Sequence, residues 1–454
     1  MRDEMCYTRI MADIAAVDIK PRVLESVTSK IIVSKNKFSF SFQKYLALSL
    51  FSGAGGLSEG FVNAGFDIVA HIEMDKDACD TLITRSIYRS LLKRNKLLEY
   101  KNYVLGLLDR DKLITRYDLQ KENESVICSK IGKGNYKNLI NEVRKRLNGQ
   151  KLDVIIGGPP CQAYSQIGRA RDVNNMRGDE RNFLYKYYIE FLKALKPKIF
   201  IFENVPGLLS AGGGKYLKDM RQLMKKAGYK TDYRIINAAD FGVPQNRKRI
   251  ILVGWRRGSG FTAYPDFLKV NRKYLVKDFM SDLPKLQAGK GLELEKFISK
   301  NILLKDLGIV EPKFNFLMGH VARHSSSMDL EIYRRAVAEK KKGKNIKYYE
   351  LPSSLQTHKN KNGFLDRFKV VDYMSRGSHT VVAHIAKDGN FYIHPDVRQN
   401  RSLTLREVAR LQTFPDSYKF EGSRTSQFKQ VGNAVPPLLS KQIAKVISKK
   451  LKNG

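Results

Sequence analysis

The chain has 454 residues, of which 42% are hydrophobic, so it is long enough for one large domain and a second, smaller one. The 82 Lys and Arg outnumber the 45 Asp and Glu, for a net charge of +37, which favours a polyanionic partner but also fits a solvated basic surface. The four cysteines lack paired spacing, which argues against a disulfide framework and a zinc site. The sequence has no signal-peptide pattern and no apolar run near the ~20 residues that span a membrane. These features predict a reduced, cytoplasmic protein.

Short apolar runs followed by amphipathic stretches alternate through the first half of the chain. This order of strand, loop and helix predicts an α/β fold, with a parallel sheet covered by helices on both faces. Two later runs with no obvious helix between them, Tyr233–Asn237 and Ile250–Val253, predict an antiparallel pair that closes the sheet. The three strand and helix pairs are Leu46–Leu50 with Leu57–Gly65, Asp153–Ile156 with Phe183–Leu195, and Ile199–Phe202 with Tyr216–Gly228.

Periodicity is lost between Arg256 and Arg401, where Pro, Ser and Lys are scattered among short irregular pieces. This region predicts a second, less regular domain. Regular structure returns with helices predicted at Leu405–Gln412 and Leu438–Lys450. Residues 1–44 give no functional signal.

A glycine-rich turn, Leu50-Phe51-Ser52-Gly53-Ala54-Gly55-Gly56-Leu57, follows the first predicted strand. Missing side chains there let a ligand approach the backbone near a helix N-terminus, although any tight turn could use such glycines. Glu73 ends the next apolar run, Ile68–Ile72, at the separation where nucleotide-binding folds place a carboxylate on ribose hydroxyls. Together these features predict a nucleoside-type cofactor; a merely solvated carboxylate is the alternative for Glu73.

Cys161 stands in the loop Gly157-Gly158-Pro159-Pro160-Cys161-Gln162, directly after a predicted strand, at the edge where α/β folds bind ligands. A lone cysteine is most often a small buried hydrophobe, but two prolines give this loop a preset backbone that can aim a thiolate. Glu203 ends the next predicted strand, so the acid and the thiol meet at one rim if the two strands are neighbours. Such a pair suits addition of thiolate to an electron-poor ring that an acid protonates.

Six stretches resemble the motifs of the DNA (cytosine-5)-methyltransferases, in the order in which that family has them. The resemblance covers almost everything from Tyr45 to Val446 outside the middle region. The stretches are the cofactor loop Phe51–Gly56, the catalytic loop Pro159–Gln162, the acid motif Glu203–Val205, the arginine motif Gln245–Arg249, and the last two motifs, Arg401–Gln412 and Gln430–Pro437.

The resemblance implies a Rossmann-like, S-adenosylmethionine-dependent methyltransferase sheet with a smaller, irregular target-recognition domain, and methylation at C5 of a cytosine flipped out of double-stranded DNA. Cys161 is the implied nucleophile at C6 and Glu203 the implied acid at N3. Arg247 and Arg249 are implied to hold the carboxyl and the base edge. Phe51 is implied to stack on the cofactor adenine and Glu73 to bind its ribose; the other implied cofactor residues are Ser52, Gly53, Gly55, Gly56, Leu57, Met74, Pro160, Leu184 and Asn433, with no metal.

The chain departs from the family pattern in two places. Ser49 stands where many members carry an acid, and an insertion between Glu73 and Asp153 leaves Asp118 as the candidate for the adenine amino group. The implied domains are an N-terminal extension (1–44), a catalytic and cofactor-binding domain (45–258), a target-recognition domain (259–400) and C-terminal motifs that return to the catalytic domain (401–454). In the third of these, groove or phosphate contacts are compatible with Lys340–Lys342, Tyr348, Tyr349 and Arg367, although each also fits a solvated surface.

Three functions remain to be separated. The leading one is DNA modification in a bacterial restriction-modification system, in the cytoplasm and at the nucleoid, with a cognate endonuclease acting on the same site. A branch of the same fold methylates tRNA, but it usually has a smaller variable region and a Cys-Phe-Thr element that is absent here. A DNA-binding protein that has lost catalysis is the third, and the joint presence of Cys161, Glu203 and Arg249 argues against it. Recognition sequence and oligomeric state cannot be read from the chain.

Overall fold

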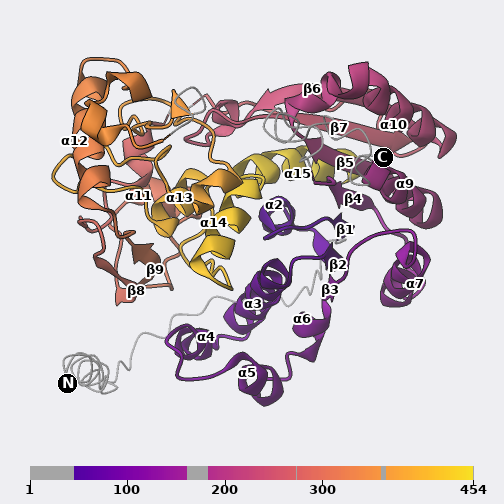
Figure 1. Ribbon diagram of the computed structural model, residues 1–454. Coiled ribbons are helices and arrows are strands. Elements are labelled where there is room, and N and C mark those ends of the chain that lie inside the picture. The colour runs from indigo at the N-terminus through magenta and orange to yellow at the C-terminus, as the bar shows by residue number, and fades with distance from the viewer. Residues whose placement is uncertain (1–44, 161–182, 272–273, 359–363, 453–454) are drawn as a thin grey trace, which may run out of the picture. The chain divides into compact units, whose positions relative to one another are not determined.

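The computed structural model describes residues 45–160, 183–271, 274–358 and 364–452 (Figure 1). A seven-stranded sheet has the order β3-β2-β1-β4-β5-β7-β6. Neighbouring strands from β3 to β5 are parallel, whereas β7 runs antiparallel to both β5 and β6, so the predicted sheet and its closing pair are confirmed. The strands are β1 (Leu46–Leu50), β2 (Asp67–Glu73), β3 (Val126–Cys128), β4 (Val154–Gly157), β5 (Ile199–Asn204), β6 (Tyr229–Asn237) and β7 (Lys248–Arg256).

Helices cover both faces of this sheet, as the sequence predicts. Leu48 and Leu50 of β1 belong to one buried cluster and Ala47 to another, because side chains alternate between the two faces of a strand. Figure 1 shows the two sets of helices on opposite sides of the strands. One face carries α7 (Tyr136–Leu147), α9 (Leu184–Leu195) and α10 (Lys215–Lys226), and the other carries α2 (Gly56–Asn63) and α15 (Pro437–Lys452).

The last helix packs closely on the helix that follows the glycine-rich turn. A Cβ on Gly60 of α2 would lie 2.3 Å from the backbone N of Lys441 in α15, so a side chain there has no room. Ser440 donates a hydrogen bond to the carbonyl of Leu57 across the same contact. The two ends of the described chain are thus joined beside the candidate cofactor loop.

An insertion of helices separates β2 from β3. It consists of α3 (Lys76–Lys93), α4 (Leu97–Val104), α5 (Arg110–Arg116) and α6 (Gln120–Glu124). Asp75 caps α3 by accepting a hydrogen bond from Ala78 N at 3.0 Å. Tyr88 and Tyr100 of the insertion share a buried cluster with Phe314, so the insertion packs against the region just before β9.

Residues 259–400 contain more regular structure than the sequence predicts. They include η6 (Val276–Phe279), β8 (Gly291–Lys296), α11 (Ile302–Leu307), β9 (Phe316–Val321), α12 (Ser327–Lys341), η7 (Tyr348–Glu350), η8 (Ser353–Leu355) and η10 (Ala383–Ala386). Strands β8 and β9 pair as a separate antiparallel sheet. Two buried clusters take up much of the region. Side chains between Ile332 and Val370 form one with Ile393, whereas side chains from Val276–Val310 and Val371–Tyr392 belong to another that includes α13 and α14.

The remaining elements connect these parts. They are η3 (Pro206–Leu209) and η4 (Ala211–Gly214) after β5, η5 (Ala238–Phe241) between β6 and β7, and α13 (Leu405–Leu411) and α14 (Arg424–Asn433) before α15. In the part of the chain that the structure describes, no helix is both long and apolar enough to cross a membrane.

Candidate active site

The sequence-predicted residues gather at the carboxyl edge of the sheet. Strand order reverses between β1 and β4, and open α/β sheets bind ligands at such a reversal. Glu73 ends β2, Phe51 follows β1, Pro160 follows β4, and Glu203 lies near the end of β5. Because β2, β1, β4 and β5 are consecutive neighbours, these four residues lie in this order along one edge.

Glu203 is paired with Arg249 from the antiparallel strand β7. Asn204 of β5 stands opposite Ile250, so the first residues of β7 lie at the carboxyl edge of β5. The Nε of Arg249 lies 2.8 Å from Oε1 of Glu203, and only 11% and 17% of the two side chains are exposed. A charge-assisted contact with this little solvent fixes the orientation of the carboxyl group. Of the two arginines implied to hold the carboxyl and the base edge, Arg249 is the one paired with Glu203 in the structure.

The loop after β4 is held against the end of β5. A Cβ on Gly157 or Gly158 would lie 1.9 Å from the carbonyl oxygen of Leu50 or Glu203, respectively, so only glycine allows this approach. Buried Asn204 donates from Nδ2 to the carbonyl of Pro159 at 3.2 Å and accepts from Val205 N at 2.9 Å. The backbone just before Cys161 is therefore anchored by Asn204, the residue that follows Glu203 in β5. Cys161 itself lies outside the described residues.

Arg247 has a different set of partners from Arg249. It is fully buried, and its Nη1 donates to the carbonyl of Val381 at 2.6 Å. Its Nη2 donates to the carbonyls of Gly432 and Asn433 at 3.3 and 3.4 Å. These bonds tie the arginine motif to the segment just before η10 and to the end of α14, so Arg247 has a bracing role that its motif alone does not indicate.

The glycine-rich turn after β1 has an unusual backbone. Phe51 has φ of 52°, a left-handed conformation that costs energy for a residue with a Cβ and that is common at functional sites. Ser52 closes the turn by accepting from Gly55 N at 3.0 Å, and its hydroxyl contacts the hydroxyl of buried Ser49 at 2.9 Å. Ser49 thus supports the turn internally at the position where the family often has an acid.

Glu73 binds the same turn. Its Oε2 accepts from Gly53 N at 2.7 Å, and its Oε1 accepts from Met74 N and Asp75 N at 2.8 and 3.0 Å. A Cβ on Gly53 would meet no heavy atom within 4 Å, so the turn is open beside this carboxylate. A carboxylate held by backbone amides at the rim of an open glycine turn fits a ribose diol.

The other candidate cofactor residues lie at different depths. Leu57 and the glycines at 55 and 56 are buried where α2 begins, Leu184 and Pro160 are half-buried, and Met74 and Asn433 are exposed. Asp118 is exposed in the linker between α5 and α6, before β3 begins. That position is in the insertion and not at the end of a sheet strand, in contrast to Glu73 at the end of β2.

Two supporting residues were missed by sequence reasoning. One is Asn204, which lies in the acid motif Glu203–Val205 and whose side chain holds the carbonyl of Pro159. The other is Tyr418, whose hydroxyl donates to the carbonyl of Ala54 in the glycine-rich turn at 2.5 Å. Its 415–420 segment gives no periodic signal, and the contact joins residues more than 360 apart, so only the folded chain reveals it.

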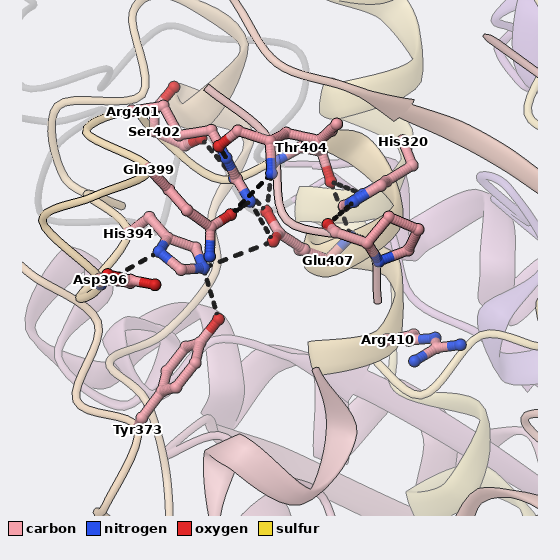
Figure 2. Close-up of polar contacts among 12 residues, drawn as sticks. His320, Tyr373, His394, Asp396, Gln399, Arg401, Ser402, Thr404, Glu407 and Arg410 are labelled. Atoms are coloured by element: carbon pink, nitrogen blue, oxygen red, sulfur yellow. Dashed lines mark hydrogen bonds and ion pairs between the residues drawn. The ribbon is translucent and has the colours of Figure 1, made fainter. Parts of the chain in front are cut away.

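The motif Arg401–Gln412 forms a buried polar cluster around α13 (Figure 2). Arg401 makes two 2.7 Å contacts with Glu407, which also caps the helix by accepting from Thr404 N. Burial opposes ionisation of Glu407, but Arg401 outweighs it and lowers the pKa of Glu407. Burial also lowers the pKa of His394, which lies beside this pair, to about 4. The motif therefore acts as internal structure in the described residues.

The basic and aromatic candidates of region 259–400 differ in exposure. Tyr348 is buried, and Arg367 is paired with Asp388 and lies over the rings of Phe364 and Phe391. Tyr349 is 63% exposed, and Lys340 and Lys342 are paired with nearby acids. Of the aromatic pair, Tyr349 is thus the one available to a partner.

Comparison with known proteins gives a consistent result. The family model for C-5 cytosine-specific DNA methylases matches residues 45–95 and 110–449. The type II methyltransferase M.Bpa9945I of Bacillus paralicheniformis is 41% identical over 440 residues, covering 88% of this chain and 98% of the relative. The type II methyltransferase M1.HphI of Haemophilus parahaemolyticus is 30% identical, covering 90% of each chain.

Among solved structures, a prophage-encoded E. coli protein described as a DNA modification methyltransferase shares the fold, with a TM-score of 0.60 at 22% identity, covering 90% of this chain and 100% of that one. The chain belongs to the C-5 cytosine-specific DNA methylase family. It is accordingly a DNA (cytosine-5)-methyltransferase whose curated relatives are type II restriction-modification enzymes. The resemblance, the Rossmann-like fold and the enzyme class expected from the sequence are confirmed.

Proposed function

We propose that this chain transfers a methyl group from S-adenosylmethionine to C5 of a cytosine that is flipped out of a specific double-stranded DNA site. In this proposal it is the modification enzyme of a restriction-modification system. The observation that carries the proposal is the Glu203–Arg249 pair, which lies at 2.8 Å beside the anchored loop leading to Cys161. An acid beside the loop that leads to a cysteine fits the chemistry of addition to a pyrimidine ring.

The residues have separate tasks in this reaction. The thiolate of Cys161 adds to C6 of cytosine while Glu203 donates a proton or hydrogen bond to N3, which raises the electron density at C5. Arg249 keeps Glu203 oriented toward the ring. C5 would then take the methyl group, and loss of the C5 proton would let the ring expel the Cys161 thiolate. Because C6 is stacked in a duplex, the target base must leave the helix to meet these groups.

The edge of the sheet beside Glu73 fits the implied cofactor. S-adenosylmethionine supplies an electrophilic methyl group when it is bound. Glu73, already bound to the amide of Gly53, would take the ribose hydroxyls, and Phe51 would take the adenine. Ser52, Gly53, Gly55, Gly56 and Leu57 would form the wall of the site from the turn, with Met74, Pro160, Leu184 and Asn433 completing it.

Two assays test the proposal. DNA and tRNA are incubated with the methyl-labelled cofactor, and label in DNA alone is expected. Bisulfite sequencing then identifies the modified cytosine. Label in tRNA alone would favour the RNA-modifying branch of this fold, and label in neither would favour a binding protein that has lost catalysis.

Cys161→Ser tests the covalent step. Serine is a poor nucleophile at neutral pH, so the variant should lose methylation, and it should form no covalent complex with DNA carrying 5-fluorocytosine at the target. Cys128→Ser is the matched control, because Cys128 is an exposed cysteine at the end of β3, and it should keep both properties. Substantial turnover by Cys161→Ser would overturn the assignment of the nucleophile.

A further inference from the structure

Tyr418 connects the C-terminal half of the chain to the glycine-rich turn. It lies between α13 and α14 and is 1% exposed. Its hydroxyl donates to the carbonyl of Ala54 at 2.5 Å, in the middle of the turn. The same oxygen atom fills the space beside Gly55, since a Cβ there would lie 2.9 Å from it. The phenol therefore both binds and shapes the turn.

The ring of Tyr418 is itself held from several directions. The guanidinium of Arg85 lies 4.9 Å from its centroid, and Arg85 is fixed by contacts with Glu59 (2.7 Å) and with Ser417 Oγ (2.9 Å). Glu59 lies on α2, the helix that begins in the turn. Burial opposes ionisation of Glu59, but Arg85 and Arg89 outweigh it and lower its pKa to about 2, so this anchor stays charged at neutral pH.

The backbone of Tyr418 is held as well. Its carbonyl accepts from Arg406 at 3.2 Å, and the nearby carbonyl of Pro415 accepts from the same guanidinium at 3.1 Å. Asp416 pairs with Arg410 at 2.7 Å. Because the backbone and the ring of Tyr418 are both fixed, its hydroxyl has little freedom. The hydroxyl therefore holds the carbonyl of Ala54 in one position.

We propose that Tyr418 is a positioning residue for the cofactor: its hydroxyl fixes the Phe51–Gly56 turn in the form in which the Gly53 amide holds Glu73 for S-adenosylmethionine. This inference rests on the proposed function. Without the hydroxyl, the carbonyl of Ala54 loses a buried partner and the turn gains freedom to rotate toward water. Cofactor binding must then restore the order that Tyr418 otherwise supplies in advance.

Tyr418→Phe tests the inference, because it keeps the ring and removes only the donor. Titration calorimetry with S-adenosylmethionine and with S-adenosylhomocysteine should give a Kd raised about 5- to 10-fold, the equivalent of one buried neutral hydrogen bond. The KM for the cofactor should rise to a similar extent, while kcat at saturating cofactor changes less than about twofold. Hydrogen exchange of a peptide spanning Phe51–Gly56 should accelerate.

Tyr100→Phe is the matched control. Tyr100 is equally buried, and its hydroxyl donates at 2.9 Å to the carbonyl of Ser417, one residue before Tyr418. This variant also loses one tyrosine hydrogen bond to a backbone carbonyl in the same region, but that carbonyl is not in the turn. It should leave cofactor Kd and exchange at Phe51–Gly56 unchanged. Thermal unfolding of both variants reports any general loss of stability.

The outcomes separate the two proposals. If the wild-type protein binds the cofactor and Tyr418→Phe has the same Kd within twofold, the positioning role is wrong and the proposed function stands. If Tyr100→Phe raises the Kd as much as Tyr418→Phe, the effect is a general loosening of the 414–421 segment, and the specific role is again wrong. If the wild-type protein binds neither cofactor form, the proposed function fails and this inference fails with it.

Discussion

Asn204 offers a direct test of how the catalytic loop is held. In Asn204→Ala the carbonyl of Pro159 and the amide of Val205 both lose their side-chain partner. The Pro159 bond is buried, and leaving such a group without a partner costs about 1–3 kcal/mol. If that free energy is expressed as a lower population of the correctly placed loop, kcat should fall roughly 5- to 150-fold, since each ~1.4 kcal/mol is a factor of ten.

The assay must separate loop placement from stability. Single-turnover methylation at saturating DNA and cofactor gives the rate, and urea unfolding gives the free energy of unfolding. Asn301→Ala is the control, because Asn301 also donates to a carbonyl, that of Asp278 (2.8 Å), and accepts from a backbone amide, that of Leu304 (3.2 Å), in a different region. It should lose comparable stability and keep its rate. A methylation rate for Asn204→Ala within twofold of wild type would refute the reasoning. An equal loss of methylation rate in Asn301→Ala would refute it as well.

Three further predictions concern the acid, pH and the DNA. Glu203→Gln can still accept from Arg249 but cannot deliver a proton, so the methylation rate should fall roughly 10²- to 10⁴-fold with little change in DNA affinity; a near-normal rate would assign the proton to another group. Burial lowers the pKa of His394 to about 4 and of His71 to about 3, so the unfolded chain, with histidine pKa near 6.5, binds more protons below pH 6.5. These two histidines should therefore contribute fully to the free energy of unfolding above about pH 6.5, and the free energy, measured by urea titration, should fall between about pH 6.5 and 4. The fall should be shallower in His394→Gln, and an unchanged slope in that variant would contradict the contribution of His394. A mismatch opposite the target cytosine should raise DNA affinity roughly 10- to 100-fold in the presence of S-adenosylhomocysteine, because ~1.4–2.8 kcal/mol of extrusion cost is removed beforehand, whereas equal affinities for matched and mismatched duplexes would count against a flipped base.

The sheet and its carboxyl edge were predictable because buried parallel strands have short apolar sequences that end at polar residues or glycines. Leu46–Leu50 and Ile199–Phe202 are such runs, and the structure extends the second only to Asn204. The helix α12 is not among the predicted elements, although Ser326 and Asp329 form a capping box at its start, which is a sequence signature of a helix N-terminus.

Other parts could not be read from local pattern. The helices α4 and α5 are short, and they are stabilised by packing against residues such as Phe314, about 200 positions away. Arg247 and Arg249 stand two residues apart in one motif, yet one binds distant backbone carbonyls and the other binds Glu203. Their difference is set by which chain segments lie beside them in the fold.

The arginines of the Arg401–Gln412 motif limit which parts of residues 259–400 can change in length. Arg401, Arg406 and Arg410 donate to the carbonyls of Leu286, Met318 and Phe279, respectively. A backbone carbonyl is present whatever the side chain, so these positions tolerate substitution, but the chain must return to the same points in space. Insertions or deletions between Phe279 and Met318 would break this register and take one hydrogen-bond partner from each buried guanidinium group.

The stretch from Ile332 to Val370 is under less constraint, since it forms a buried cluster of its own with Ile393. Length changes there can be absorbed without moving the arginine contacts. If target specificity resides in residues 259–400, a new site should be acquired most readily by exchanging about residues 327–370 alone. A graft of the whole region would have to place three backbone carbonyls where Arg401, Arg406 and Arg410 can donate to them. Such grafts should therefore more often yield protein that fails to fold.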